Sequence, residues 1–217
     1  MGEELKIKAV IFDYDGTLAP LNLDFASLRQ EILKIAFKYV PISILYSVDG
    51  LHILELVYEI ESLLGEKGGK FRTEAFSKLK ELEVEAALKK SVFPYTRYVL
   101  KALKERGVKR GIMTRTCVEA VSTSFFDYSD YVEVIVTRDD VERVKPHPDH
   151  VRKVLEKLKT IPQESMIVGD HPTDIMAGTS LGMRTVGVLT GRTGTDEFVK
   201  VGATYIFQDI REILNLI

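Results

Sequence analysis

The sequence has 217 residues, of which 45% are hydrophobic and 29% charged, enough for a buried core and a charged surface in one domain or one domain with an insertion. Its formal net charge of -2 gives no electrostatic case for binding nucleic acid or an anionic membrane. The single cysteine excludes an internal disulfide and a cysteine-based zinc site. Residues 1–6 lack the pattern of a secretory signal, and no apolar run approaches the ~18 residues of a membrane span, so we expect a cytoplasmic protein.

The first predicted element is a short buried strand that ends in two carboxylates. Its apolar run stops at Asp13, and Asp15 and Gly16 follow, with Gly16 able to bend the chain sharply. Chemistry in α/β sheets concentrates at the carboxyl ends of parallel strands. Two acids at positions i and i+2 repel each other unless a cation lies between them. Taken alone, however, this stretch is also compatible with a plain Asp-Gly turn.

The next part of the chain carries helical patterns and no strand signal. Asp24 can cap a helix that starts at Phe25 and extends to about residue 39, and Pro41 stops it. Apolar residues at helical spacing predict two further helices, over 49–64 and over 73–90.

A separate helical domain is the simplest account of this stretch. Residues 19–92 number 74, too many for an ordinary connection between strands. We therefore predict a helical cap domain over 19–92, inserted into a core domain formed by 1–18 and 93–217. A Gly- and Lys-rich turn is expected over 65–70, and the Lys/Glu run from Lys78 to Lys90 indicates a solvated helix face.

From residue 94 onward, predicted helices and strands alternate. The strands are expected over 109–114, 132–137, 165–169, 184–188 and 204–207. Helices are expected over 94–107, 147–158 and 172–182, and His147 and His150 lie near the start of the second of these. A further helix is expected directly after a capping-box pattern at 116–119. This alternation predicts an α/β fold with a doubly wound, parallel, Rossmann-like sheet.

Polar residues follow several of these strands and should share one crevice. Thr114, Lys145, Asp170 and Asp174 lie at or just beyond predicted strand ends, as Asp13 does. Pro146 favours an extended backbone at Lys145, which would project the ammonium group. Singly, each has a structural explanation: a strand-closing threonine, a solvated lysine, or an acid in the first turn of a helix.

Together these residues form a set suited to phosphoryl transfer. Asp13, Asp15 and Asp170 offer the oxygen ligands that Mg²⁺ prefers. Lys145 offsets negative charge, and the Thr114 hydroxyl with the backbone amides after it can hold phosphate oxygens. One carboxylate can attack phosphorus while another protonates the leaving oxygen.

The sequence resembles the haloacid dehalogenase-like hydrolase superfamily, and specifically its helical-cap phosphatases of the phosphoglycolate phosphatase type. Asp13–Thr17 is similar to the first family motif and Gly111–Thr114 to the second. Lys145-Pro146 resembles the third motif and Gly169–Asp174 the fourth, in the family's order. The resemblance therefore covers the core domain from end to end.

The resemblance implies a role for each motif residue. Asp13 would be the nucleophile, and Asp15 the general acid for the leaving alcohol and then the base for water. Mg²⁺ would be bound by Asp13 and Asp170 through their side chains and by Asp15 through its backbone carbonyl. Asp174 would hold a metal-bound water or the loop.

Phosphate binding falls, by the same resemblance, to Thr114 and Lys145, with Lys145 also restraining Asp13. Two positions depart from the family pattern. His171 stands where a small hydroxyl residue is expected, and we interpret it as a helix cap. Arg115 follows Thr114 and is either a further phosphate contact or an exposed side chain.

The implied activity is hydrolysis of a small-molecule phosphate monoester. We expect no nucleic-acid or membrane partner, and a protein that is a monomer or a homodimer. Asp15 disfavours a haloacid dehalogenase, which needs no acid two residues after the nucleophile. A phosphomutase shares every core residue and stays open. From a different class, a non-catalytic signalling domain could accept phosphate on an aspartate, although such domains have adjacent acids and no helical insertion. The loop over 190–194 is flexible enough to approach phosphate, but we interpret it as an ordinary connecting loop.

Overall fold

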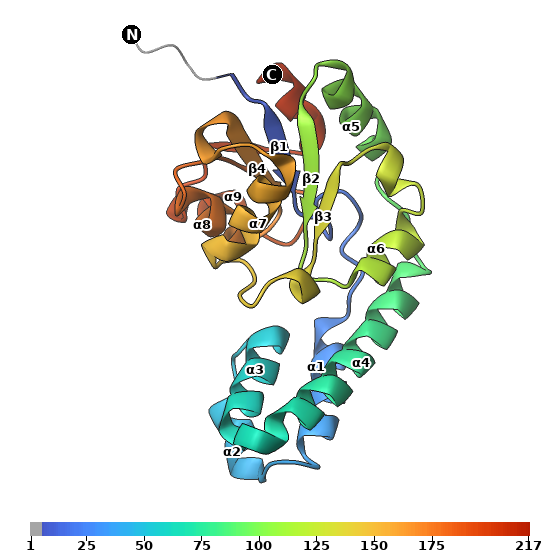
Figure 1. The fold of residues 1–217 in the computed structure, drawn as a ribbon, viewed down its shortest axis with the longest axis vertical. Coiled ribbons are helices and arrows are strands. Elements are labelled where there is room, and N and C mark those ends of the chain that lie inside the picture. The colour runs from blue at the N-terminus through green and yellow to red at the C-terminus, as the bar shows by residue number, and fades with distance from the viewer. Residues whose placement is uncertain (1–5) are drawn as a thin grey trace. The chain divides into compact units, whose positions relative to one another are not determined.

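The computed structural model describes residues 6–217 and contains a six-stranded parallel sheet in the order β3-β2-β1-β4-β5-β6 (Figure 1). The predicted α/β, Rossmann-like fold is confirmed. The expectation that the chain has no secretory signal rests mostly on residues 1–5, which lie outside the described residues. The strands are β1 (Ala9–Phe12), β2 (Lys109–Met113), β3 (Val134–Val136), β4 (Ser165–Gly169), β5 (Arg184–Val188) and β6 (Tyr205–Phe207).

Strand β1 lies in the middle of the sheet and is buried on both faces. Val10 and Phe12 belong to one hydrophobic cluster, whereas Ala9 and Ile11 belong to another. Successive side chains of a strand point to opposite faces, so a strand covered on both sides is apolar throughout. This burial is the reason why the first polar residue of the stretch, Asp13, coincides with the strand's end.

Helices cover both faces of the sheet. Residues of α7 (Pro148–Leu158) and α8 (Pro172–Thr179) pack in the cluster that contains Ile11. Residues of α5 (Thr96–Glu105), α6 (Val118–Ser124) and the 3-10 helix η5 (Ile210–Asn215) pack in the cluster that contains Phe12. The short helix α9 (Thr195–Lys200) and η5 have no counterpart among the predicted elements. Each is only six residues long, too short for a periodic pattern to stand out.

The chain divides into two compact units, one formed by residues 22–86 and the other by the remainder. The predicted insertion, 19–92, is longer at both ends. Ala19 and Val92 are buried in the hydrophobic cluster of the sheet domain, which places the residues beside them in that unit.

The unit over 22–86 is entirely helical. Its helices are α1 (Phe25–Ala36), α2 (Ile42–Ser47), α3 (Ile53–Leu64), the 3-10 turn η1 (Gly65–Lys67) and α4 (Gly68–Ala87). Asp24 caps α1 as predicted, since its carboxylate accepts hydrogen bonds from the backbone N–H groups of Ala26 and Ser27, both at 3.1 Å.

Two predictions for this unit are wrong. The helix expected over 49–64 starts only at Ile53, as α3, because a turn at Gly50, which has a positive φ of 85°, precedes it, and α2 lies outside the expected range. The turn expected over 65–70 ends at Lys67, because Gly68 already has helical dihedral angles. A Cβ atom on Gly68 would lie 2.2 Å from the carbonyl oxygen of Glu61, so this glycine allows a close approach between α3 and α4.

Among residues 6–217, no helix combines the length and hydrophobicity that crossing a membrane would require.

Candidate active site

The candidate site lies at the carboxyl ends of the central strands. Strand β1 pairs with β2 on one side and with β4 on the other, so Asp13, Thr114 and Asp170 emerge from three adjacent strands. The sheet order reverses direction between β1 and β4, the switch point at which open α/β sheets bind ligands. Sheet topology thus brings residues more than 150 positions apart in sequence to one edge.

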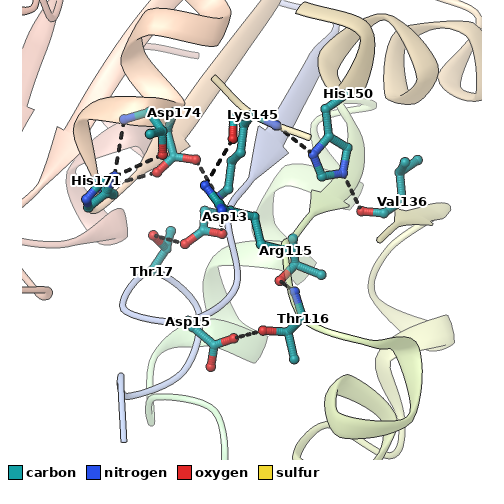
Figure 2. A network of polar contacts seen from close by, with 12 residues as sticks. Asp13, Asp15, Thr17, Arg115, Thr116, Val136, Lys145, His150, His171 and Asp174 are labelled. Carbon is teal, nitrogen blue, oxygen red and sulfur yellow. Dashed lines mark hydrogen bonds and ion pairs between the residues drawn. The ribbon is translucent and has the colours of Figure 1, made fainter. Parts of the chain in front are cut away.

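Asp13 is held by a buried ammonium group (Figure 2). Lys145 forms ion pairs with Asp13 and with Asp174, the latter with an Nζ–Oδ1 distance of 2.6 Å. The three side chains are at most 7% exposed. The negative charge of the two carboxylates raises the pKa of Lys145 despite its burial, so the lysine is charged at every physiological pH.

Asp13, Asp170 and Asp174 form a compact carboxylate cluster, with one oxygen of each within 4.8 Å of the others. Burial raises the pKa of Asp170 to about 9, and the charges of Asp13 and Asp174 add to the shift. Burial likewise raises the pKa of Asp13, with Lys145 acting in the opposite direction. Buried carboxylates that repel one another are stabilised by a bound cation, and their hard oxygens suit Mg²⁺.

Two glycines surround Asp170. A Cβ atom on Gly16, which has a positive φ of 93°, would lie 2.2 Å from Asp170 Oδ2, and one on Gly191 would lie 1.8 Å from the same oxygen. The Thr190 hydroxyl donates to the backbone carbonyl of Gly16, which ties the loop over 190–194 to the turn after β1. This loop, interpreted from the sequence as an ordinary loop, therefore packs against Asp170 of the carboxylate cluster.

Asp15 lies beside the cluster but contacts other partners. Its Oδ2 accepts a hydrogen bond from the Thr116 hydroxyl at 2.7 Å, and its Oδ1 is paired with the Lys90 ammonium group. The capping box predicted at Thr116 is wrong: Cys117 is the N-cap of α6, without a side-chain capping bond. The Thr116 hydroxyl is directed at Asp15 instead, as Figure 2 shows.

Thr114 is buried at the end of β2, and its hydroxyl accepts a hydrogen bond from the Thr116 backbone N–H at 3.1 Å. Arg115 donates from its guanidinium group to the backbone carbonyl of Lys145 at 3.3 Å. The structure therefore brings Arg115 to the loop that carries Lys145, and the role of Arg115 toward phosphate stays a prediction.

His171 is the N-cap of α8, as predicted. Its ring Nδ1 accepts from the Thr173 backbone N–H at 3.3 Å, while Asp174 accepts from the His171 backbone N–H at 3.2 Å. These reciprocal bonds orient the Asp174 carboxylate toward Lys145. A Cβ atom on Gly169 would lie 2.3 Å from the Asp174 carboxyl carbon, so a glycine is required at the end of β4.

His150 supports Lys145 from inside the fold. It is completely buried; its Nδ1 accepts from the Lys145 backbone N–H at 3.2 Å, which leaves Nε2 to donate to the Val136 carbonyl at 3.2 Å (Figure 2). Burial, together with the Lys145 charge, lowers the pKa of His150 to about 3. The imidazole is therefore neutral in the folded protein across the physiological pH range.

This neutral histidine predicts a loss of stability in acid. In the unfolded chain this histidine binds a proton below its ordinary pKa of 6.5, whereas in the folded protein it stays neutral down to about pH 3. The free energy of unfolding is therefore unaffected by His150 above pH 6.5 and decreases as the pH falls from 6.5 toward 3. Over this pH range, the free energy of unfolding of the wild type should fall more steeply than that of His150→Gln. The difference in slope should be up to about 1.4 kcal/mol per pH unit. Urea unfolding of both proteins at a series of pH values measures the difference, and identical pH slopes would contradict the assignment.

Sequence reasoning located six of the site residues that the structure gathers: Asp13, Asp15, Thr114, Lys145, Asp170 and Asp174. It does not identify Thr116, which fits a capping-box pattern, or Lys90, which belongs to a charged run typical of a solvated face. It also missed Gly191, although the high glycine content of the loop was a signal of close backbone approach.

Comparison with known proteins is consistent with this arrangement. A family model described as haloacid dehalogenase-like hydrolase matches residues 10–188. The pyrophosphatase PpaX of Bacillus cereus (strain ATCC 10987 / NRS 248) is 30% identical over 199 residues, covering 85% of this chain and 84% of the relative.

Solved structures show the same fold. A HAD phosphatase from Thermococcus onnurineus has a TM-score of 0.64 at 28% identity, with 97% of each chain covered. A structure described as a predicted phosphoglycolate phosphatase from Haemophilus somnus has a TM-score of 0.64 at 22% identity, again with 97% of each chain covered.

Proposed function

The chain belongs to the haloacid dehalogenase-like hydrolases, and on that basis we propose that it is a Mg²⁺-dependent phosphatase that acts through an aspartyl-phosphate on Asp13. The observation that carries the proposal is the Asp13 carboxylate itself. It lies at the switch point of the sheet, 5% exposed, with Lys145 on one oxygen and two further carboxylates close by. Such a group is oriented and partly desolvated, as a carboxylate nucleophile needs to be.

In the first half of the proposed reaction, an Asp13 oxygen attacks phosphorus and the bond to the leaving oxygen breaks. Asp15 donates its proton to that oxygen, so the product leaves as an alcohol. Lys145 restrains Asp13 and offsets negative charge, while the Thr114 hydroxyl and backbone amides hold phosphate oxygens.

In the second half, water attacks the phosphorus of the aspartyl-phosphate and Asp15 takes its proton. Inorganic phosphate leaves, Asp13 is regenerated as a carboxylate, and Asp15 is again protonated for the next cycle.

Asp13 and Asp170 are the side chains that would hold Mg²⁺, with the Asp15 backbone carbonyl as a further ligand and Asp174 oriented beside them. The fit rests on the buried carboxylate cluster, whose raised pKa values reflect burial and unbalanced negative charge. When bound, the ion would neutralise charge on the phosphoryl group and orient it for attack.

Two substrate classes have support. The motif resemblance favours small organic phosphate monoesters, whereas the PpaX relative is named a pyrophosphatase, which favours inorganic diphosphate. In both cases the bond broken joins phosphorus to oxygen and Asp13 is the acceptor. A cytoplasmic location and a monomeric or homodimeric state stay predictions.

We expect wild-type protein to release phosphate from an aryl phosphate with Mg²⁺ and to release none with excess chelator. A panel of diphosphate, alkyl phosphates and sugar phosphates, assayed for free phosphate, ranks the substrate classes.

Conversion of a sugar phosphate into its isomer without release of phosphate would favour a phosphomutase. Stable labelling by acetyl phosphate without turnover of any phosphate would favour a signalling domain. Phosphate release at the same rate with chelator present would contradict metal dependence.

A further inference from the structure

Lys90 is a nearly buried cation at the edge of the candidate site. It lies three residues after α4 ends at Ala87, and its side chain is 6% exposed, while that of its partner Asp15 is 11% exposed. Lysine is rarely buried without a charged partner, because removing an ammonium group from water is costly. The expectation of a solvated face from Lys78 to Lys90 is therefore wrong at Lys90, and it is also wrong at Glu83, which is 5% exposed.

Three groups fix the Lys90 ammonium. It pairs with Asp15, donates to the Pro20 backbone carbonyl at 3.3 Å, and lies 5.4 Å from the centroid of the Tyr14 ring. The Tyr14 hydroxyl is itself hydrogen-bonded to the Ser124 hydroxyl at 2.7 Å, which holds the ring in place. The cation thus has a defined position rather than a mobile one.

Each oxygen of the Asp15 carboxylate has its own anchor. Lys90 holds Oδ1, and the Thr116 hydroxyl holds Oδ2 at 2.7 Å. The Thr116 backbone N–H in turn donates to the Thr114 hydroxyl at 3.1 Å, which connects Asp15 to the proposed phosphate-binding residue. Both oxygens of Asp15 therefore have fixed partners, which sets the plane and direction of the carboxyl group.

We propose that Lys90 is a positioning residue for Asp15 and that, with Thr116, it keeps the carboxyl group in the orientation that protonates the leaving oxygen. This inference rests on the proposed function, since it concerns the acid of that reaction. As the phosphorus–oxygen bond breaks, the Asp15 proton moves to the leaving oxygen and Asp15 becomes a carboxylate. Lys90 itself neither gives nor takes a proton.

The test compares Lys90→Met with wild type on two phosphate monoesters, an alkyl phosphate and 2,4-dinitrophenyl phosphate. An alkoxide needs a proton in order to leave, whereas dinitrophenolate leaves without one. Because departure of the leaving group is the first irreversible step, kcat/KM reports that step for both substrates. We expect kcat/KM for the alkyl phosphate to fall by about 10–100-fold, against less than about 3-fold for the dinitrophenyl ester.

Lys90→Arg, which keeps the charge, should recover part of the lost activity on the alkyl phosphate. Lys89→Met, a change at the exposed neighbouring lysine, should leave both values near wild type. Thr116→Val removes the other anchor of Asp15 and should show the same selective loss, so the inference stays testable if Lys90→Met does not fold. Circular dichroism verifies the fold of each variant.

Equal losses on the two substrates in both Lys90→Met and Thr116→Val would overturn the positioning role, while leaving the proposed function intact. Inactive wild type on both esters and on diphosphate would instead overturn the proposed function, and the inference would fall with it.

Discussion

Asp13→Asn is expected to lower the rate of phosphate release by at least about 10³-fold, the largest effect of any substitution considered. The amide has nearly the shape of the carboxylate but is a poor nucleophile, so no aspartyl-phosphate can form at the normal rate. Lys145 keeps Asp174 as a charged partner, with a distance of 2.6 Å, so the lysine is not left without a counter-ion. The measurement is phosphate release from an aryl phosphate with Mg²⁺ present.

Thermal unfolding of the same variant separates a chemical effect from a structural one. Burial raises the pKa of Asp13, which means that the charged form costs stability in the folded protein near neutral pH. The Asp13→Asn protein, which is neutral at this position, should therefore melt at or above the wild-type temperature in the absence of metal. A lower melting temperature, accompanied by loss of the folded circular dichroism signal, would contradict this account of the activity loss.

Asp170→Asn should raise the Mg²⁺ concentration needed for half-maximal activity by at least about 100-fold, because it removes a charged oxygen ligand from the carboxylate cluster. Gly191→Ala should act in the same direction with a smaller effect. Its Cβ atom would lie 1.8 Å from Asp170 Oδ2, so the carboxylate has to turn away. Titration of activity with Mg²⁺ measures both effects.

Gly194→Ala is the matched control in the same loop. A Cβ atom on Gly194 would have no neighbour within 4 Å, and its φ of -88° is open to alanine. This variant should keep the wild-type Mg²⁺ requirement. If Gly191→Ala and Gly194→Ala behave alike, packing of Gly191 against Asp170 has no bearing on the metal.

Much of the site could be predicted because strand burial and strand ends are local properties of the sequence. Asp13 and Asp170 each follow a run of buried apolar residues, and a parallel sheet brings such ends to one edge. Four motifs in family order then supplied the roles that residue types alone left open. The α/β fold followed from the alternation of helix and strand patterns.

The remaining site residues depend on tertiary contacts that no local pattern encodes. Thr116 fits a capping box, yet its hydroxyl reaches Asp15, 101 positions away in sequence. Lys90 ends a charged run whose other members gave no reason to separate it from a solvated face. Gly191 matters because Asp170 packs against it, which only the path of the loop reveals.

The most direct test of the central claim is to locate the phosphate during turnover. Wild-type protein is mixed with a ³²P-labelled aryl phosphate and Mg²⁺, quenched in acid within milliseconds, digested, and the labelled peptide is sequenced by mass spectrometry. The account predicts a hydroxylamine-sensitive label on Asp13 that forms and decays at rates consistent with turnover, and no label in Asp13→Asn. A label on any other residue, or phosphate release by Asp13→Asn at the wild-type rate, would contradict it.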